Sequence, residues 1–383
     1  MSIAPRRGSA TSSLSVMMFL QYAVWGVWLP YLANYLQQPT EVQAVARAVA
    51  DVDQLGAWMD TVQASPEQQA AFDLVRQAAA AVATAGEDPA VLSDALDQVA
   101  GRLSAMAPPP ATGDADAATP TSEVATEAAR RAADLGKQAS NLEHANHGLG
   151  FTGGQIGWIL GLAGSIGALF APFVAGQVAD RFLNAEKALG LLLIGGGIVK
   201  FATAYATDYS SFMALSIVYS ILYMPTLALT NSVAFANLDD AEKSFPRVRT
   251  WGTIGWIVAS NAFPLIWLQT QLRGTALPPF LTGEAKPNDV ALIVDCLKVS
   301  GAMAVAYGFW AMLALPKTPP KKDVENPLAF LKAFGLLRHP GFLVVTLAAL
   351  PIAMIHQVYF IRTGPYLGSI GIEAAKIGPM MSI

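Results

Sequence analysis

The sequence has little charge and almost no cysteine. Only 14% of its 383 residues are Asp, Glu, Lys or Arg, compared with about 25% in soluble domains. The single cysteine, Cys296, excludes an internal disulfide and a Cys/His zinc site. No nucleophile and base pair, metal cluster or phosphate-binding glycine loop is evident, so we expect no enzyme, no metal and no cofactor. The net charge of -4 gives no indication of nucleic-acid binding.

Long apolar runs dominate instead. Hydrophobic residues make up 53% of the chain, and the mean hydropathy is +0.41. Runs of about 20 mostly apolar residues predict membrane-spanning helices, because backbone in lipid must satisfy its own hydrogen bonds. The predicted spans are residues 14–36, 151–178, 187–206, 211–236, 250–270, 296–315 and 341–363. An eighth begins near Glu373 and is unfinished at Ile383, so we expect the chain to be a fragment.

Basic residues in the short loops predict the orientation, because such residues concentrate on the cytoplasmic side. With a cytoplasmic N-terminus, that side receives Arg6, Arg7, Arg181, Lys187, Lys243, Arg247, Lys317, Lys321, Lys322, Lys332 and Arg338. The short loops of the opposite side hold Arg273, Lys286 and Lys376. We therefore expect the N-terminus to be cytoplasmic.

A polar, Ala-rich insert separates the first two spans, and this topology makes it periplasmic. Its runs Glu41 to Met59, Pro66 to Ala85 and Pro89 to Met106 have helical propensity, and residues 108–121 are typical of a linker. The insert is either a cap or docking module, or an insertion tolerated in a loop. The predicted domains are residues 1–37 (first span), 38–148 (insert), 149–315 (spans two to six), 316–340 (cytoplasmic linker) and 341–383 (span seven and the start of span eight).

Several motifs narrow the choice of protein family. A glycine, an acid and a base follow the second span at Gly176, Asp180 and Arg181. The other motifs are Phe19-Leu20-Gln21 with Trp25-Gly26-Val27-Trp28-Leu29, Tyr223-Met224-Pro225-Thr226-Leu227 and Arg249-Thr250-Trp251-Gly252-Thr253-Ile254-Gly255-Trp256. The chain resembles the nucleoside:proton symporters of the major facilitator superfamily. The resemblance implies the first six helices of a twelve-helix bundle plus the start of its second half, with Gly176, Asp180 and Arg181 as a conformational latch.

The fifth span carries the strongest substrate-binding candidates. An arginine that enters the bilayer tends to face a watery cavity or a partner, and Arg249, Thr253 and Trp256 share one helical face by their spacing. A guanidinium, a hydroxyl and an indole suit the ribose hydroxyls, base edge and flat base of a nucleoside. The resemblance implies the same contacts, although the family's aromatic residue is commonly phenylalanine. The alternative is that Arg249 extends to the cytoplasmic headgroups.

The seventh span adds Gln357, which matches a substrate-reading glutamine of the family, whereas Phe360 replaces the family's asparagine. His356 is a candidate for proton coupling because histidine as a residue type can gain and lose a proton near neutral pH, or it packs between helices. Lys200 has no assigned role, since its stem is long enough to reach the outer interface. No Asp or Glu lies in the middle of a span, so the resemblance implies a coupling acid beyond this chain.

The predicted function is import of nucleosides with protons by alternating access, in a bacterial inner membrane and as a monomer. The expected partners are the nucleoside, the proton and the lipid bilayer. Two alternatives stay open: a major facilitator carrier of another small polar solute, and a receptor or scaffold that transports nothing. A carrier is expected to survive deletion of the insert, and a receptor is not.

Overall fold

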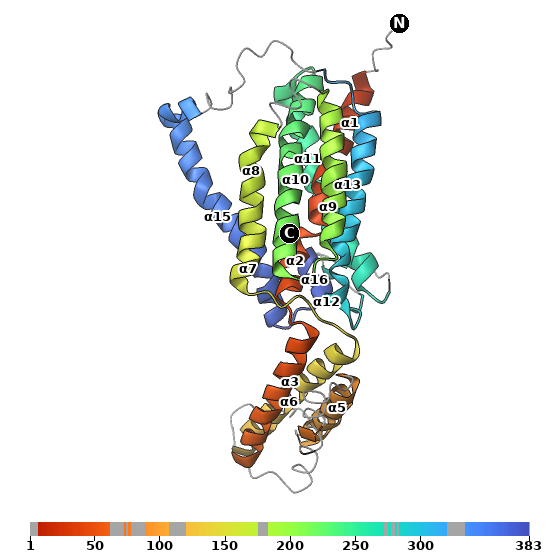
Figure 1. Ribbon diagram of the computed structural model, residues 1–383, viewed down its shortest axis with the longest axis vertical. Helices are drawn as coiled ribbons and strands as arrows, with labels where there is room; N and C mark the ends of the chain where they lie inside the picture. The colour runs from red at the N-terminus through yellow and green to blue at the C-terminus, as the bar shows by residue number, and fades with distance from the viewer. Residues whose placement is uncertain are drawn as a thin grey trace. The chain divides into compact units, whose positions relative to one another are not determined.

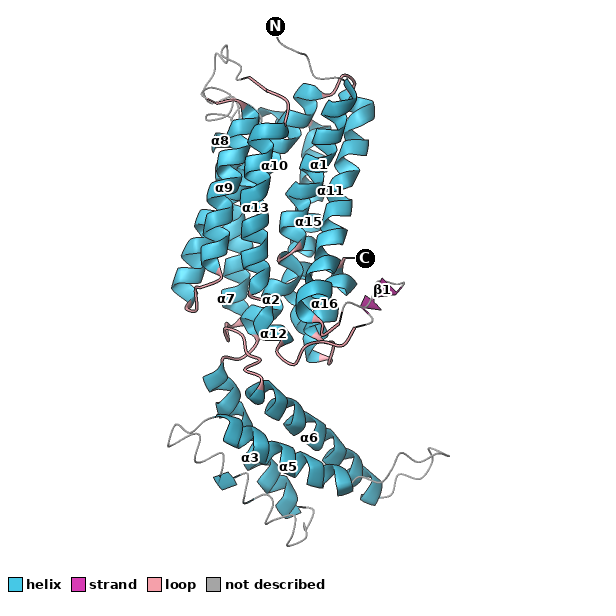
Figure 2. Ribbon diagram, turned by 90° about the vertical axis from the view of Figure 1, so that its right-hand side faces the viewer, coloured by secondary structure: helices cyan, strands magenta, loops and turns pink. Residues whose placement is uncertain are grey.

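The computed structural model describes residues 7–61, 73, 76–77, 89–106, 120–174, 183–271, 275–276, 280–281, 283–319 and 334–382. The chain forms two compact units: Met1–Gln37 with Phe151–Ile383, called the membrane unit here, and Gln38–Gly150, called the insert unit. Helices account for nearly all the regular structure of the described residues (Figure 2). This confirms the predicted all-α class.

The membrane unit begins with two consecutive helices that together form the first span. Its helices are α1 (Arg7–Gly26), α2 (Leu29–Gln37), α7 (Gly153–Gly157), the π-helix η1 (Trp158–Leu162), α8 (Ala163–Val174), α9 (Ala185–Thr203), α10 (Tyr209–Asn237), α11 (Ala241–Phe263), the π-helix η3 (Pro264–Leu268), α12 (Asp289–Leu292), α13 (Asp295–Ala314), the 3-10 helix η4 (Phe334–Arg338), α15 (Pro340–Ser369) and α16 (Ala374–Met381). Strands β1 (Thr275–Ala276) and β2 (Phe280–Leu281) pair antiparallel, with Thr275 opposite Leu281.

Six segments of the described chain are long and apolar enough to cross a membrane: Thr11–Gln37, Gly153–Ala171, Tyr209–Asn237, Ala241–Leu268, Asp289–Ala314 and Pro340–Ser369. The predicted third span, α9, is not among these six, because it carries three charged residues, Glu186, Lys187 and Lys200. It nevertheless packs lengthwise against α10 and α13 within the bundle (Figure 1). Burial of Glu186 and Lys200 inside the protein, at 2% and 4% exposed, explains how the helix tolerates these charges.

Glycines set the helix crossings. A Cβ on Gly197 of α9 would lie 2.6 Å from the carbonyl oxygen of Gly301 on α13, and Gly190 and Gly308 of the same helices approach in the same way at 2.7 Å. Small residues of this kind let membrane helices approach until their backbones touch. The described helices α9 and α13 are thus held together by backbone contact, with the other helices arranged beside them (Figure 1).

Helix ends follow local chemistry. The carboxylates of Asp208 and Asp240 accept hydrogen bonds from Ser211 N at 2.9 Å and Lys243 N at 3.2 Å, which caps α10 and α11. At the other end of α10, Asn237 Nδ2 donates to Thr318 Oγ1 at 2.9 Å, and Thr318 N donates to Glu186 Oε2 at 2.9 Å. The loops predicted to be cytoplasmic therefore meet at one end of the bundle.

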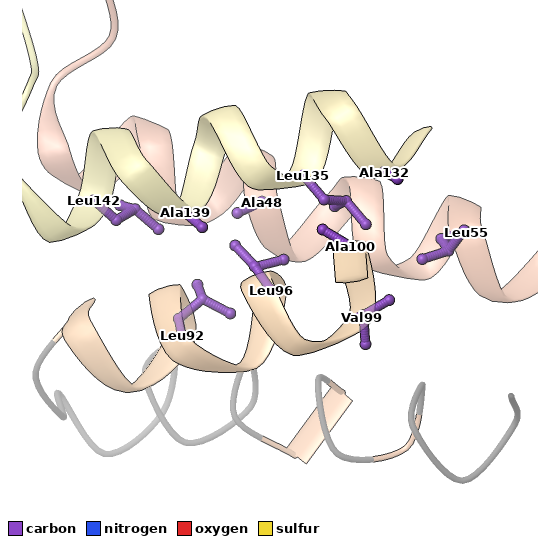
Figure 3. Close-up of a cluster of buried hydrophobic side chains, with 10 residues drawn as sticks. All are labelled: Ala48, Leu55, Leu92, Leu96, Val99, Ala100, Ala132, Leu135, Ala139 and Leu142. Atoms are coloured by element: carbon purple, nitrogen blue, oxygen red, sulfur yellow. The ribbon is translucent and has the colours of Figure 1, made fainter. Parts of the chain in front are cut away.

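The insert unit is a small helical bundle. Its described helices are α3 (Glu41–Thr61), α5 (Pro89–Met106) and α6 (Pro120–Glu143). Figure 3 shows the apolar faces of all three around one buried cluster, to which Leu55, Leu96 and Leu135 belong. The sequence predicted α3 and α5, whereas α6 begins in the predicted linker. Most of the predicted helix 66–85 lies outside the described residues.

Candidate functional site

A cavity of about 490 Å³ lies inside the membrane unit. Its wall combines aromatic rings with polar groups contributed by several helices: Trp25, Trp28, Ser165, Lys200, Ser216, Tyr219, Ser220, His356, Gln357 and Phe360. Cavities of about 300–1,000 Å³ with an apolar wall and a few polar groups are typical of small-molecule sites. None of the described residues that line the cavity is Asp or Glu.

Gln357 connects the two sides of this cavity. It lies on α15, and its Nε2 donates a hydrogen bond to the carbonyl oxygen of Leu160 at 2.8 Å. Leu160 belongs to η1, and π-helical turns of this kind occur often at functional sites. One of the two amide N–H groups of Gln357 is therefore engaged with the second span in this conformation. A ligand that takes this donor must replace the bond to Leu160.

The fifth-span residues lie outside the cavity wall. The guanidinium carbon of Arg249 lies 4.1 Å from the ring centre of Tyr22 on α1. Trp256 meets Phe360 of α15 edge to face, with ring centres 5.5 Å apart. Thr253 is exposed. The structure thus brings Trp256 against a residue of the cavity wall, but brings neither Arg249 nor Thr253 into the wall.

The glycines of the fifth-span motif explain this arrangement. A Cβ on Gly252 would lie 2.6 Å from Cδ2 of Tyr22, and a Cβ on Gly255 would collide with the Phe19 carbonyl. Both glycines therefore admit α1 against α11. The Arg249 guanidinium, one turn before Gly252, then covers the Tyr22 ring as a cation–π contact.

His356 lies on the same helix as Gln357 and lines the cavity. Its ring meets Phe360 edge to face, with ring centres 4.8 Å apart. The side chain is exposed, so a proton can reach it from the cavity side. The predicted latch residues Gly176, Asp180 and Arg181 lie outside the described residues.

Comparison with known proteins decides the family. The sequence profile described as Nucleoside H+ symporter matches residues 139–383, which is more than half of the chain. The chain belongs to the nucleoside H+ symporter family. This is a family of multi-pass membrane transporters and not of enzymes, as the sequence predicted.

Two curated relatives of this chain come from Escherichia coli (strain K12). The putative nucleoside transporter YegT is 36% identical over 230 residues, 59% of this chain and 50% of that protein. Xanthosine permease is 30% identical over 227 residues, 57% of this chain and 49% of that protein. The chain spans about half the length of these two relatives.

The fold of the chain also matches a solved structure. A crystal structure of a point mutant of the nucleoside transporter NupG covers 97% of this chain and 64% of that chain, with a TM-score of 0.56 and 18% identity. The likeness confirms the predicted major facilitator bundle.

Sequence reasoning missed the placement of Lys200. The sequence left Lys200 without a role because its stem is long enough to reach the outer interface, whereas the structure shows the residue 4% exposed and lining the cavity. Its Nζ lies 3.2 Å from the ring centre of Trp28 and 4.2 Å from that of Tyr219. The signal was present in the sequence, because a charged residue within a membrane helix usually faces the bundle interior or a watery cavity.

Proposed function

We propose that this symporter imports nucleosides together with protons by alternating access, with the described cavity as part of the substrate path. The observation that carries the proposal is a cavity of about 490 Å³ inside the membrane unit, in which indole and phenol rings lie beside Gln357 and three serines. A nucleoside presents a flat base and several hydroxyl groups, and this wall offers both apolar rings and hydrogen-bonding groups.

We assign Arg249, Thr253, Trp256 and Gln357 to substrate binding. The Trp256 ring contacts the Phe360 ring. Gln357 and Phe360 both line the cavity. A rotation of α15 that separates Trp256 from Phe360 would extend the cavity towards α11. Arg249 and Thr253, on the same face of α11 as Trp256, would then reach the substrate.

The packing of α15 makes such a movement feasible. Among its described residues, Phe360 and Gly364 are buried, whereas large apolar residues from Phe342 to Val358 are exposed. Rigid movement of one bundle against another around a central site is the general mechanism of such carriers. The bond from Gln357 to Leu160 is one of the contacts that must change, and substrate binding would replace it.

Proton coupling and the latch belong to the same proposal. We assign His356 to proton coupling because it lines the cavity at an exposed position, and Gly176, Asp180 and Arg181 to the latch between conformations. We infer that the protein resides in the bacterial inner membrane as a monomer with a cytoplasmic N-terminus. Hydrogen bonds join Glu186, Asn237 and Thr318 at one end of the bundle. All three lie at loops predicted to be cytoplasmic, which agrees with that orientation.

Uptake of radiolabelled uridine and adenosine tests the proposal. The complete gene, expressed in a cell without its own nucleoside carriers, should raise uptake of both, and a protonophore should abolish the rise. Substitution of Arg249 with Ala should reduce uptake, whereas Arg247→Ala, at an exposed position on the same helix, should not. Background uptake of nucleosides combined with uptake of a sugar or peptide would refute the proposal.

The runner-up function is transport of another small polar solute. It would keep the bundle and the cavity but would not require Arg249. Uptake of such a solute that is unchanged in the Arg249→Ala variant would favour this function over nucleoside transport.

A further inference from the structure

Hydrogen-bond donors gather at one point of the cavity wall. The side chains of Lys200, Trp28 and Tyr219 come from α9, the turn between α1 and α2, and α10. They are 4%, 7% and 4% exposed, and all three line the cavity. The ammonium lies over both rings, and the rings meet edge to face with centres 6.1 Å apart. We call these three residues the donor cluster.

The donor cluster has few acceptors of its own. Trp28 Nε1 and Tyr219 Oη are buried, and neither makes a hydrogen bond with a described residue outside the cluster. Among the described residues Lys200 makes no ion pair, and none of the described cavity-lining residues is acidic. Two ring faces stabilise the ammonium only in part, because burial removes its water shell. A buried charge of this kind inside a membrane bundle usually marks a solute or ion path.

The chemistry of the cluster selects a ligand. A lysine ammonium has three donors and no acceptor, an indole N–H only donates, and a tyrosine hydroxyl can do both. Carbonyl oxygens on a base satisfy these donors, whereas an exocyclic amino group would bring a further donor against them. An unpaired buried donor is unfavourable, so the cluster discriminates between the two kinds of base edge.

We propose that Lys200, Trp28 and Tyr219 form a subsite that binds the carbonyl edge of a nucleoside base. This inference rests on the proposed transport of nucleosides and adds a substrate class to it. The preferred substrates are oxo nucleosides such as uridine and inosine, and the disfavoured ones are their amino counterparts, cytidine and adenosine. Lys200 supplies the charge, and Trp28 and Tyr219 hold the ammonium in place while offering their own polar atoms.

Two matched pairs of nucleosides test the subsite. Uridine and cytidine differ by an oxo or amino group at C4 and by the proton on the adjacent N3, and inosine and adenosine differ in the same way at C6 and N1. In cells that express the complete gene, uptake of the oxo member should exceed that of the amino member by roughly 12- to 160-fold, the range expected from one hydrogen bond to a charged group. Equal uptake within both pairs would overturn the subsite while leaving nucleoside transport intact. Absence of uptake for all four would overturn the proposed function and the subsite with it.

Substitution of Lys200 assigns the preference to this residue. Lys200→Met keeps the length of the side chain without the charge and should bring both oxo-to-amino ratios close to one. Lys200→Arg keeps a donor-only cation and should preserve most of the preference. The ratios are internal to each variant, so a lower amount of protein in the membrane does not change them. If Lys200→Met does not reach the membrane, Lys200→Gln, which also lacks the charge, replaces it in the comparison with the wild-type ratios. A Lys200→Met or Lys200→Gln variant with the wild-type ratios would overturn the inference.

Discussion

Replacement of Gly197 with Ala tests the packing that holds α9 in the bundle. The added Cβ would lie 2.6 Å from the Gly301 carbonyl oxygen and 2.9 Å from Val305 N. Ordinary van der Waals contact begins at 3.4 Å, so the backbones of α9 and α13 must separate by about 0.8 Å. Both neighbours are backbone atoms and cannot rotate away. The variant should therefore be destabilised, even though alanine favours a helix.

The matched control is Gly195→Ala, two residues earlier in α9. There the added Cβ would lie 3.6 Å from Leu222 Cδ1, which is an ordinary contact. Alanine stabilises a helix by about 1 kcal/mol relative to glycine, and overpacking costs about 1–3 kcal/mol. The free energy of unfolding of Gly195→Ala should thus rise by up to about 1 kcal/mol. That of Gly197→Ala should lie between the wild-type value and a value about 2 kcal/mol below it.

Thermal unfolding of the purified protein in detergent measures the difference. A gap of about 1–3 kcal/mol between the two variants corresponds to a Tm of Gly197→Ala roughly 2–10 °C below that of Gly195→Ala. Gly301→Ala should behave like Gly197→Ala, because its Cβ would meet the Gly197 carbonyl oxygen at 2.6 Å. A Gly197→Ala variant that melts at or above Gly195→Ala would refute the argument that direct backbone contact joins the two helices.

Three further predictions concern function. Gln357→Ala should raise the KM for uridine by roughly 2- to 13-fold, the equivalent of one hydrogen bond, as measured by initial uptake rates; an unchanged KM would remove Gln357 from the site. Replacement of residues 38–150 with a short Gly-Ser loop should leave nucleoside uptake largely intact, because Phe151 N and Leu36 O already join the ends of the membrane unit by a 2.7 Å hydrogen bond; loss of uptake with normal membrane insertion would show that the insert is required. His356→Gln should weaken uptake driven by a pH gradient more than exchange of internal for external uridine, and equal loss in both assays would contradict a role in coupling.

Six of the seven predicted spans coincide with apolar segments long enough to cross a membrane in the described chain, because each of them depends on local apolar content. α10 and α15 illustrate this, since the predicted 211–236 and 341–363 lie within Tyr209–Asn237 and Pro340–Ser369. The break at Val27 and Trp28 within the first span was not predicted. Helix α6 was missed because the prolines before it suggested a linker throughout residues 108–121.

The side-chain directions could not be predicted because they depend on contacts between distant helices. Gly190 and Gly197 fix the rotation of α9 against α13, and only that rotation turns Lys200 inwards to Trp28. Similarly, the spacing of Arg249, Thr253 and Trp256 predicted a shared face, but the contact of Gly252 and Gly255 with α1 determines where that face points.

Protection of the cavity from chemical labelling by a nucleoside tests the central proposal most directly. The only native cysteine, Cys296, is buried, so a cysteine introduced at Ser165 in the exposed part of the cavity wall reports on the cavity. Uridine should slow maleimide labelling of Ser165→Cys, and sucrose should not. A cysteine at Ser210, exposed at the start of α10, should react at the same rate with and without uridine. Labelling of Ser165→Cys that is unaffected by uridine, at a concentration that saturates uptake, would contradict the assignment of this cavity to nucleoside transport.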